Sequence, residues 1–219
     1  MKKKTLYICP SVLSADFARL GEEVRRAEEA GADRLHLDIM DGHFVPNISF
    51  GPKVVAAINR STSLFLEVHL MIYNPFQYIE PFVEAGADLI SFHFEATEDV
   101  EETLEYIRRC HIQTGLAINP ETPVSFLPKY FPLMDEVLLM SVHPGFGGQP
   151  FIEESLSRIA ELATYLKSFP EHAVDIAVDG GINNITGPEC VKAGANLLVS
   201  GNYLYSAPDM GKAMLELRK

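Results

Sequence analysis

The sequence predicts an α/β fold, a single (β/α)8 barrel, also called a TIM barrel. Three observations support this: a repeated junction between helix and strand, eight candidate strands at a regular interval, and polar residues near the carboxyl ends of several strands. The chain has 219 residues, of which 47% are hydrophobic and 22% charged. That length is enough to bury a sizeable core, so we expect one domain covering residues 1–219.

Three segments share the same pattern, in which an amphipathic helix ends at a glycine and an apolar strand follows. They read EEAGADRLHLDI, VEAGADLISFHF and VKAGANLLVSGN. Glycine at this point suits the left-handed conformation that closes a helix. Gly31, Gly86 and Gly194 are separated by 55 and 108 residues, which equal two and four units of about 27 residues in an eight-unit barrel. The three strands are therefore predicted to be the second, fourth and eighth.

The other strands are found at the same interval. They are TLYICPSVL, LFLEVHLM, QTGLAIN, DEVLLMSV and AVDIAVDGG, predicted as strands one, three, five, six and seven. Helices are expected between them, for example over Phe17–Ala30 and Glu98–Cys110. An open doubly wound sheet alternates in the same way, but the count of eight favours the barrel. The glycine-dense segment HPGFGGQPF after the sixth strand is expected to be a mobile active-site loop.

Charge and cysteine content exclude several classes of protein. The net charge of −12 would repel nucleic acid and anionic membranes, so we expect neither as a partner. The three cysteines show neither metal-type spacing nor a disulfide framework, which indicates a reducing compartment. The apolar stretch that breaks at Pro10 is too short for a signal-peptide core. We expect a cytoplasmic homo-oligomer.

Polar residues stand where a barrel has its active site, at the carboxyl ends of the strands. His36 and Asp38 share one face of the second strand because side chains alternate. His69 lies on the third strand, His93 ends the fourth and Asp179 ends the seventh. One buried histidine is more often a hydrogen-bonded core residue. The cluster of His36, Asp38, His69 and Asp179 instead indicates a site for a divalent cation such as Zn²⁺, Mn²⁺, Fe²⁺ or Co²⁺.

Two further features fall at the same end of the barrel. Met40, Met71 and Met140 could be core filler or an apolar wall that keeps water from a reactive intermediate, and the two roles are compatible. Glycine pairs follow the last three strands, in GFGGQ, DGGINN and SGN, and none of these segments contains Lys or Arg. Backbone N–H groups of such loops often bind phosphate, which would allow an acidic protein to hold an anion.

The chain resembles the ribulose-phosphate 3-epimerase family over essentially its full length. The resemblance lies in CPSVLSADFARL, LHLDIMDGHFVPNISFGP, EVHLMIYNP, HPGFGGQPF and VDGGIN. It implies a barrel of the ribulose-phosphate binding type, a catalytic divalent metal ion, and reversible epimerisation at C3 between D-ribulose 5-phosphate and D-xylulose 5-phosphate. These substrates are small phosphorylated ketoses and members of the pentose phosphate pathway.

Residue by residue, the resemblance assigns two sets of contacts. The family's metal ligands fall on His36, Asp38, His69 and Asp179. Its substrate contacts fall on Ser11, His69, Gly145, Phe146, Gly147, Gly148, Gly180, Gly181, Gly201 and Asn202. Two positions depart from the family pattern: His143 replaces the usual Asn, Asp or Glu, and Asn202 replaces Ser or Thr. Neither is a predicted metal ligand, although either could affect substrate preference.

Inversion at a carbon next to a ketone needs two groups that transfer protons and no redox cofactor. A base removes the C3 proton to give an enediolate, and an acid on the opposite face returns a proton. Asp38 and Asp179 are expected to fill these roles while also binding the metal, which would stabilise the developing charge. Asp41 and His43 follow the strand and are expected to orient the loop.

Three alternatives are less consistent with the sequence. One is a 3-epimerase of a hexulose phosphate such as D-allulose 6-phosphate, but VDGGIN and GFGGQ favour the pentulose. Another is a phosphate-binding barrel lyase, which we would expect to carry a lysine beside Asp38, where Ile39 and Met40 stand instead. A degenerate barrel that only binds ligands would have lost at least one metal ligand, and all four are present.

Overall fold

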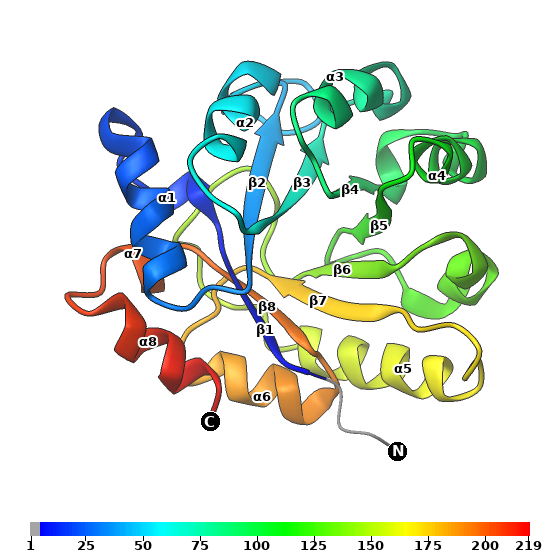
Figure 1. Cartoon of the computed structure of the whole chain (residues 1–219). Helices are drawn as coiled ribbons and strands as arrows, with labels where there is room; N and C mark the ends of the chain where they lie inside the picture. Colours follow the sequence, from blue (N-terminus) through cyan, green and yellow to red (C-terminus); the bar gives the residue numbers. More distant parts are fainter. Residues whose placement is uncertain (1–4) are drawn as a thin grey trace.

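The computed structural model describes residues 5–219 and shows eight parallel strands in a ring surrounded by helices (Figure 1). Consecutive strands are neighbours in the order β1-β8-β7-β6-β5-β4-β3-β2. A single parallel bridge between Ser11 and His36 brings β1 beside β2 and closes the ring. The predicted barrel is therefore confirmed, because an open doubly wound sheet would reverse its strand order at a switch point. The strands are β1 (Tyr7–Pro10), β2 (Arg34–Met40), β3 (Phe65–Met71), β4 (Leu89–His93), β5 (Gln113–Ile118), β6 (Glu136–Met140), β7 (Asp175–Asp179) and β8 (Leu197–Ser200).

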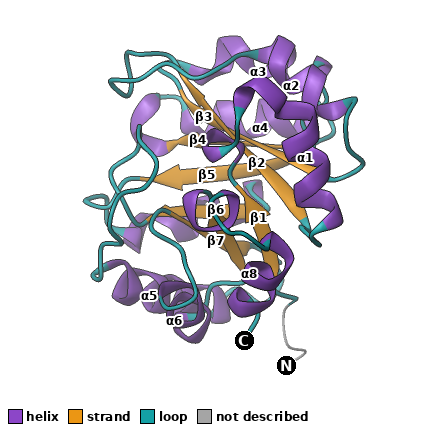
Figure 2. Ribbon diagram, turned by 90° about the vertical axis from the view of Figure 1, so that its left-hand side faces the viewer, coloured by secondary structure: helices purple, strands orange, loops and turns teal. Residues whose placement is uncertain are grey.

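Helices connect the strands on the outside of the ring (Figure 2). The α-helices are α1 (Leu20–Glu29), α2 (Pro52–Asn59), α3 (Ile79–Glu84), α4 (Val100–Arg109), α5 (Ser155–Lys167), α6 (Thr186–Ala193), α7 (Asn202–Tyr205) and α8 (Met210–Leu217). Short 3-10 helices are η1 (Val12–Ser14), η2 (Phe17–Arg19), η3 (Pro75–Tyr78), η4 (Phe94–Ala96) and the longer η5 (Val124–Leu133). Within residues 5–219, no helix combines the length and apolar character needed to cross a membrane.

Two predicted elements differ in their boundaries. The first strand ends at Pro10 rather than continuing to Leu13, because the chain turns into η1 at Val12. The helix predicted over Phe17–Ala30 is divided into η2 and α1, and the Asp16 side chain accepts a hydrogen bond from the N–H of Ala18 at 3.0 Å. Such local capping by an aspartate starts the 3-10 turn before the α-helix begins.

The three glycines of the repeated junction behave as predicted. Gly31, Gly86 and Gly194 have φ values of 93°, 100° and 127°. These are positive values that side-chain-bearing residues rarely adopt, so glycine is the residue that lets each helix turn directly into the following strand.

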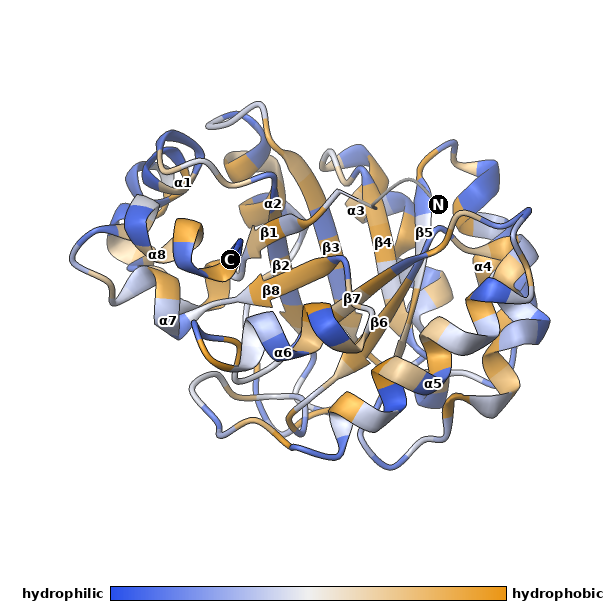
Figure 3. Ribbon diagram, turned by 90° about the horizontal axis from the view of Figure 1, so that it is seen from below, coloured by the Kyte–Doolittle hydropathy of each residue, from blue (hydrophilic) through white to orange (hydrophobic). Residues whose placement is uncertain are grey.

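The main hydrophobic core lies between the strands and the helices. On β2, Leu35, Leu37 and Ile39 join this outer core, whereas His36 and Asp38 point to the barrel interior. Hydrophobic residues dominate the strands in Figure 3, with hydrophilic positions interrupting them. A smaller apolar cluster fills part of the interior, and it comprises Cys9, Ala117, Leu138, Met140, Val142, Ala177, Leu197 and Val199.

Strand register places the polar interior residues side by side. Asp38 on β2 pairs with His69 on β3, and His36 pairs with Glu67 two residues earlier. Because alternate residues face the same side of a strand, both pairs lie inside the ring. The carboxyl ends of β2, β3 and β7 therefore meet at one mouth of the barrel, where the active sites of this fold lie.

Candidate active site

Four side chains converge inside the barrel near this mouth. One donor atom from each of His36, Asp38, His69 and Asp179 lies within 4.8 Å of those of the other three. His36 Nε2 is 3.3 Å from both His69 Nδ1 and Asp38 Oδ1, and it is 3.9 Å from Asp179 Oδ2. His69 Nδ1 is 3.1 Å from Asp38 Oδ1. The structure thus brings together the four residues that the sequence singled out.

The two carboxylates of this cluster differ in electrostatic environment. Burial and the nearby charge of Asp38 raise the pKa of Asp179 to about 7. Burial would also raise the pKa of Asp38, but the charge of His36 and hydrogen bonds with His36 and His69 hold that pKa well below its usual range. Burial lowers the pKa of His69 to about 4, which leaves its ring neutral at neutral pH.

The donor set fits a divalent cation. Two imidazoles and two carboxylates are ligands that borderline ions accept, and a cation would relieve the repulsion between Asp38 and Asp179. On the ring nitrogens that point away from the cluster, His69 has a hydrogen-bond partner, whereas His36 has a carboxylate at ion-pair distance without a hydrogen bond. His69 Nε2 is 2.9 Å from His93 Nε2, and His36 Nδ1 is 3.5 Å from Glu67 Oε2. Such outer partners orient the ligands of metal sites.

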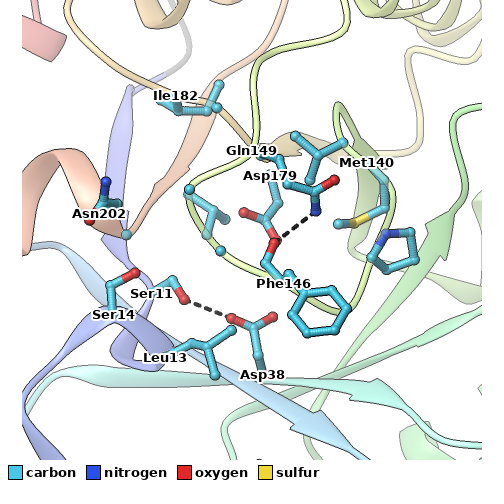
Figure 4. A pocket seen from close by; sticks show the side chains of 18 of the residues that line it. Ser11, Leu13, Ser14, Asp38, Met140, Phe146, Gln149, Asp179, Ile182 and Asn202 are labelled. Atoms are coloured by element: carbon cyan, nitrogen blue, oxygen red, sulfur yellow. Dashed lines mark hydrogen bonds between the residues drawn. The ribbon is translucent and has the colours of Figure 1, made fainter. Parts of the chain in front are cut away.

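A pocket of about 410 Å³ opens above the cluster (Figure 4). Asp38 and Asp179 both line it, whereas His36 and His69 are fully buried beneath it. The Ser11 hydroxyl donates a hydrogen bond of 2.6 Å to Asp38 Oδ2. All the other predicted substrate and wall residues also line this pocket, namely Ser11, Gly145, Phe146, Gly147, Gly148, Gly180, Gly181, Gly201, Asn202, Met40, Met71 and Met140.

The glycine-rich loop between β6 and α5 forms one side of the pocket. Gln149 Nε2 donates to the carbonyl oxygens of His143 at 2.7 Å and Phe146 at 2.8 Å, which holds the loop in a compact turn. Asn47 Nδ2 donates to the Gly145 carbonyl at 2.7 Å and ties this loop to the one after β2. The sequence pattern identified the loop but did not predict this role of Gln149 and Asn47. Their hydrogen-bond partners are backbone carbonyl oxygens, which a sequence motif does not specify.

The glycines after β7 are required by close packing. Gly180 and Gly181 have φ values of 119° and 66°. A Cβ atom on Gly181 would lie 2.6 Å from the backbone nitrogen of Phe151, and one on Gly180 would lie 2.9 Å from that of Val142. Backbone therefore passes close to backbone at this edge of the pocket, and only glycine permits the approach.

The remaining predicted polar residues have distinct positions. Asp41 accepts hydrogen bonds from the backbone N–H groups of His43 at 2.7 Å, Phe44 at 2.8 Å and Tyr73 at 2.9 Å, so it organises the loop after β2. His143 is exposed and pairs with Glu121 at 2.6 Å, and it does not line the pocket. Of the two departures from the family pattern, only Asn202 lines the pocket.

An eight-stranded barrel with carboxylates, histidines and glycine-rich loops at the carboxyl ends of its strands defines an enzyme of the (β/α)8 class. The sequence model of the ribulose-phosphate 3-epimerase family matches residues 7–205. The chain belongs to this family and is an isomerase.

Similar proteins cover the whole barrel. The ribulose-phosphate 3-epimerase of Chlamydia pneumoniae is 50% identical over 210 residues, which are 95% of this chain and 92% of that protein. The ribulose-phosphate 3-epimerase of Bacillus subtilis is 46% identical over 211 residues, covering 96% and 97%. Among solved structures, a mutant tryptophan synthase alpha subunit from Pyrococcus furiosus superposes with a TM-score of 0.72 at 16% identity, covering 98% and 97%, and this likeness concerns the fold alone.

Proposed function

We propose that residues 1–219 act as one catalytic domain that interconverts D-ribulose 5-phosphate and D-xylulose 5-phosphate by inverting C3 through an enediolate. The observation that carries this proposal is the placement of Asp38 and Asp179 in one pocket whose rim consists of glycine-rich loops. The family membership supports the epimerase activity. The two carboxylates supply the pair of proton-transfer groups that an inversion requires.

Asp38 and Asp179 approach the substrate space from different strands. Asp38 lies on β2 and Asp179 on β7, with β1 and β8 between them in the ring. In the proposed reaction one carboxylate removes the C3 proton and the other returns a proton to the opposite face. The Ser11 hydroxyl, which donates to Asp38 Oδ2, holds that carboxylate in place.

The proposed metal site consists of His36, Asp38, His69 and Asp179. When bound there, a divalent cation such as Zn²⁺, Fe²⁺, Mn²⁺ or Co²⁺ supplies Lewis-acid stabilisation for negative charge on the substrate oxygens. The neutral ring of His69 presents Nδ1 toward this cluster, while both aspartates provide the charge that complements a cation.

The other lining residues bind the substrate and exclude water. Met40, Met71 and Met140 are buried beside the two aspartates and form an apolar wall. No lysine or arginine lines this pocket in the described chain, so we propose that backbone N–H groups of the three glycine loops hold the phosphate. The absence of a lining lysine also disfavours the lyase alternative. The homo-oligomer and the cytoplasmic location stay predictions from the sequence.

Metal removal and a substrate comparison test the proposal. The purified protein should epimerise D-ribulose 5-phosphate faster than D-allulose 6-phosphate, lose activity after chelation, and regain it with Zn²⁺, Mn²⁺, Fe²⁺ or Co²⁺. Metal analysis on the same samples should show about one ion per chain when active. Full turnover in a verified metal-free preparation would contradict the four-ligand site, and a preference for the hexulose phosphate would contradict the substrate.

A further inference from the structure

A chain of contacts leads outward from the proposed ligand His69. His69 Nε2 lies 2.9 Å from His93 Nε2, and His93 Nδ1 lies 3.3 Å from Glu95 Oε2. Both histidines are fully buried, and the Glu95 side chain is 24% exposed. Neither His93 nor Glu95 lines the pocket, and His69 is the residue of the proposed metal site that His93 contacts through a ring nitrogen.

The outer end of this chain is held firmly by the turn after β5. Glu95 Oε1 accepts hydrogen bonds from the backbone N–H of Asn119 at 2.9 Å and from the Thr122 hydroxyl. Arg158 on α5 in turn donates to the carbonyl oxygens of Asn119 at 2.8 Å and Thr122 at 2.9 Å. The carboxylate therefore has a fixed position, with its second oxygen directed at His93.

These contacts determine where the ring protons lie. An ionised carboxylate only accepts hydrogen bonds, so His93 must carry its proton on Nδ1, which leaves a lone pair on His93 Nε2. That lone pair can accept only if His69 carries its proton on Nε2. A proton on His69 Nε2 leaves Nδ1 free to bind a cation held between His69, Asp38 and His36, as a metal ligand requires. Without a cation, Asp38 favours a proton on that same Nδ1, and His93 and Glu95 oppose this by favouring the proton on Nε2.

We propose that His93 and Glu95 are positioning residues that hold His69 in the tautomer able to bind a metal ion through Nδ1. This inference rests on the proposed metal site. It assigns a purpose to a buried histidine and a glutamate that the reaction itself does not use, and it connects the metal site to the turn after β5. Outer partners of this kind typically change metal affinity by about 10- to 100-fold when they are removed.

The substitution Glu95→Gln tests the order of donors and acceptors along the Glu95–His93–His69 contacts, because the side chain keeps nearly the same size. The N–H of Asn119 requires the glutamine carbonyl oxygen on its side, so the amide NH₂ group must face His93 Nδ1. His93 would then have to donate from Nε2, and His69 would have to carry its proton on Nδ1, the nitrogen needed by the metal. We expect the dissociation constant for Zn²⁺, measured by competition with a chromogenic chelator, to rise about 10- to 100-fold.

The matched control is Glu121→Gln, which removes the carboxylate of an exposed pair with His143 in the same region. This variant should bind Zn²⁺ like the wild type. Equal Zn²⁺ affinity, within about threefold, for Glu95→Gln and the wild type would overturn the positioning role while leaving the proposed function intact. If the wild-type protein itself bound no Zn²⁺, the metal site and the inference that depends on it would both fall.

A second measurement needs no variant, in case Glu95→Gln does not fold. Long-range ¹H–¹⁵N correlation spectra of the Zn²⁺-loaded wild-type protein, labelled at histidine, report which ring nitrogen carries each proton. We expect protons on Nε2 of His69 and on Nδ1 of His93. A proton on Nε2 of His93 would exclude the proposed order of donors and acceptors.

Discussion

Asp38 and Asp179 are two identical side chains that their surroundings make different. Asp38 accepts a hydrogen bond from the Ser11 hydroxyl and lies against two imidazole rings. Burial and the neighbouring negative charge of Asp38 instead raise the pKa of Asp179 to about 7. Environments that separate the pKa values of two carboxylates in this way are typical of acid–base pairs. A bound cation would favour the ionised form of both, so the assignment of roles has to come from the faces of C3 that they address.

Asn substitutions at these two positions test that assignment. Asp38→Asn and Asp179→Asn should each lower the epimerisation rate by about 10²- to 10⁴-fold, because one proton-transfer group is missing. The remaining carboxylate should still exchange the C3 proton of one epimer with deuterated solvent, and the two variants should favour opposite epimers, as measured by NMR. Only variants shown to contain metal are informative, because each aspartate is also a proposed ligand.

Two outcomes would contradict the opposed-carboxylate mechanism. The first is exchange of the same epimer by both metal-containing variants. The second is full epimerisation activity in either of them. The proposed metal site could survive both results, since it depends on ligation and not on proton transfer.

Among the elements of the barrel, the strand ends supply the reacting groups of the proposed reaction, and the loops supply the proposed binding groups. The strands hold Asp38 and Asp179 by parallel pairing, while the loops after β6, β7 and β8 expose backbone close to the pocket. Gly201, just after β8, illustrates the close fit. A Cβ atom there would lie 2.5 Å from the hydroxyl oxygen of Ser14 in η1, which also lines the pocket.

The substitution Gly201→Ala should therefore weaken substrate binding. Displacing Ser14 and blocking the approach of the phosphate would cost about one charged hydrogen bond, equivalent to an increase in KM of about tenfold or more. Metal content should not change, because the four proposed ligands are other residues, and Gly201 is not one of them. Gly51→Ala is a suitable control, since no atom lies within 4 Å of a Cβ atom at Gly51. An unchanged KM for Gly201→Ala in steady-state kinetics would place the phosphate elsewhere.

At the scale of the whole molecule, the barrel interior also contains charged side chains at its opposite end, near the amino-terminal ends of the strands. Arg34 Nη1 is 2.6 Å from Glu67 Oε1 and 3.6 Å from Glu136 Oε2, and the guanidinium lies over the rings of Tyr7 and Phe65. Burial and the charge of Glu67 raise the pKa of Glu136. Arg34 thus compensates buried acidic groups beneath the proposed metal site.

Removing that arginine should destabilise the entire barrel. Arg34→Met leaves Glu67 without its closest cation, so we expect the free energy of unfolding to fall by about 3–5 kcal/mol, the range for breaking a buried ion pair. Urea unfolding followed by circular dichroism measures this. Arg19→Met removes one partner of an exposed pair with Asp16 and should leave the unfolding midpoint unchanged. An Arg34→Met variant as stable as the wild type would mean that Glu67 and Glu136 do not need the positive charge of Arg34 in the folded barrel.

The barrel and the residues of the proposed metal cluster could be predicted from the sequence alone, because both depend on local patterns. Alternation along β2 separates Leu35 and Leu37 from His36 and Asp38, and a glycine marks each of three junctions into a strand. Once eight strands run parallel around a ring, their carboxyl ends must meet, so residues at those ends could be assigned to one site from their order in the chain.

The partners of those residues follow only from the packing of distant segments. His93 was visible at the end of a strand, but its contact with His69 and the link to Glu95 depend on how β3, β4 and the turn after β5 pack together. The pairing of Arg34 with Glu67 likewise joins different strands. His143 has a motif position beside the substrate loop, yet its side chain points to Glu121 and solvent. Periodicity indicates which face of a strand a residue occupies, whereas hydrogen bonds depend on distances between segments that only the folded chain brings together.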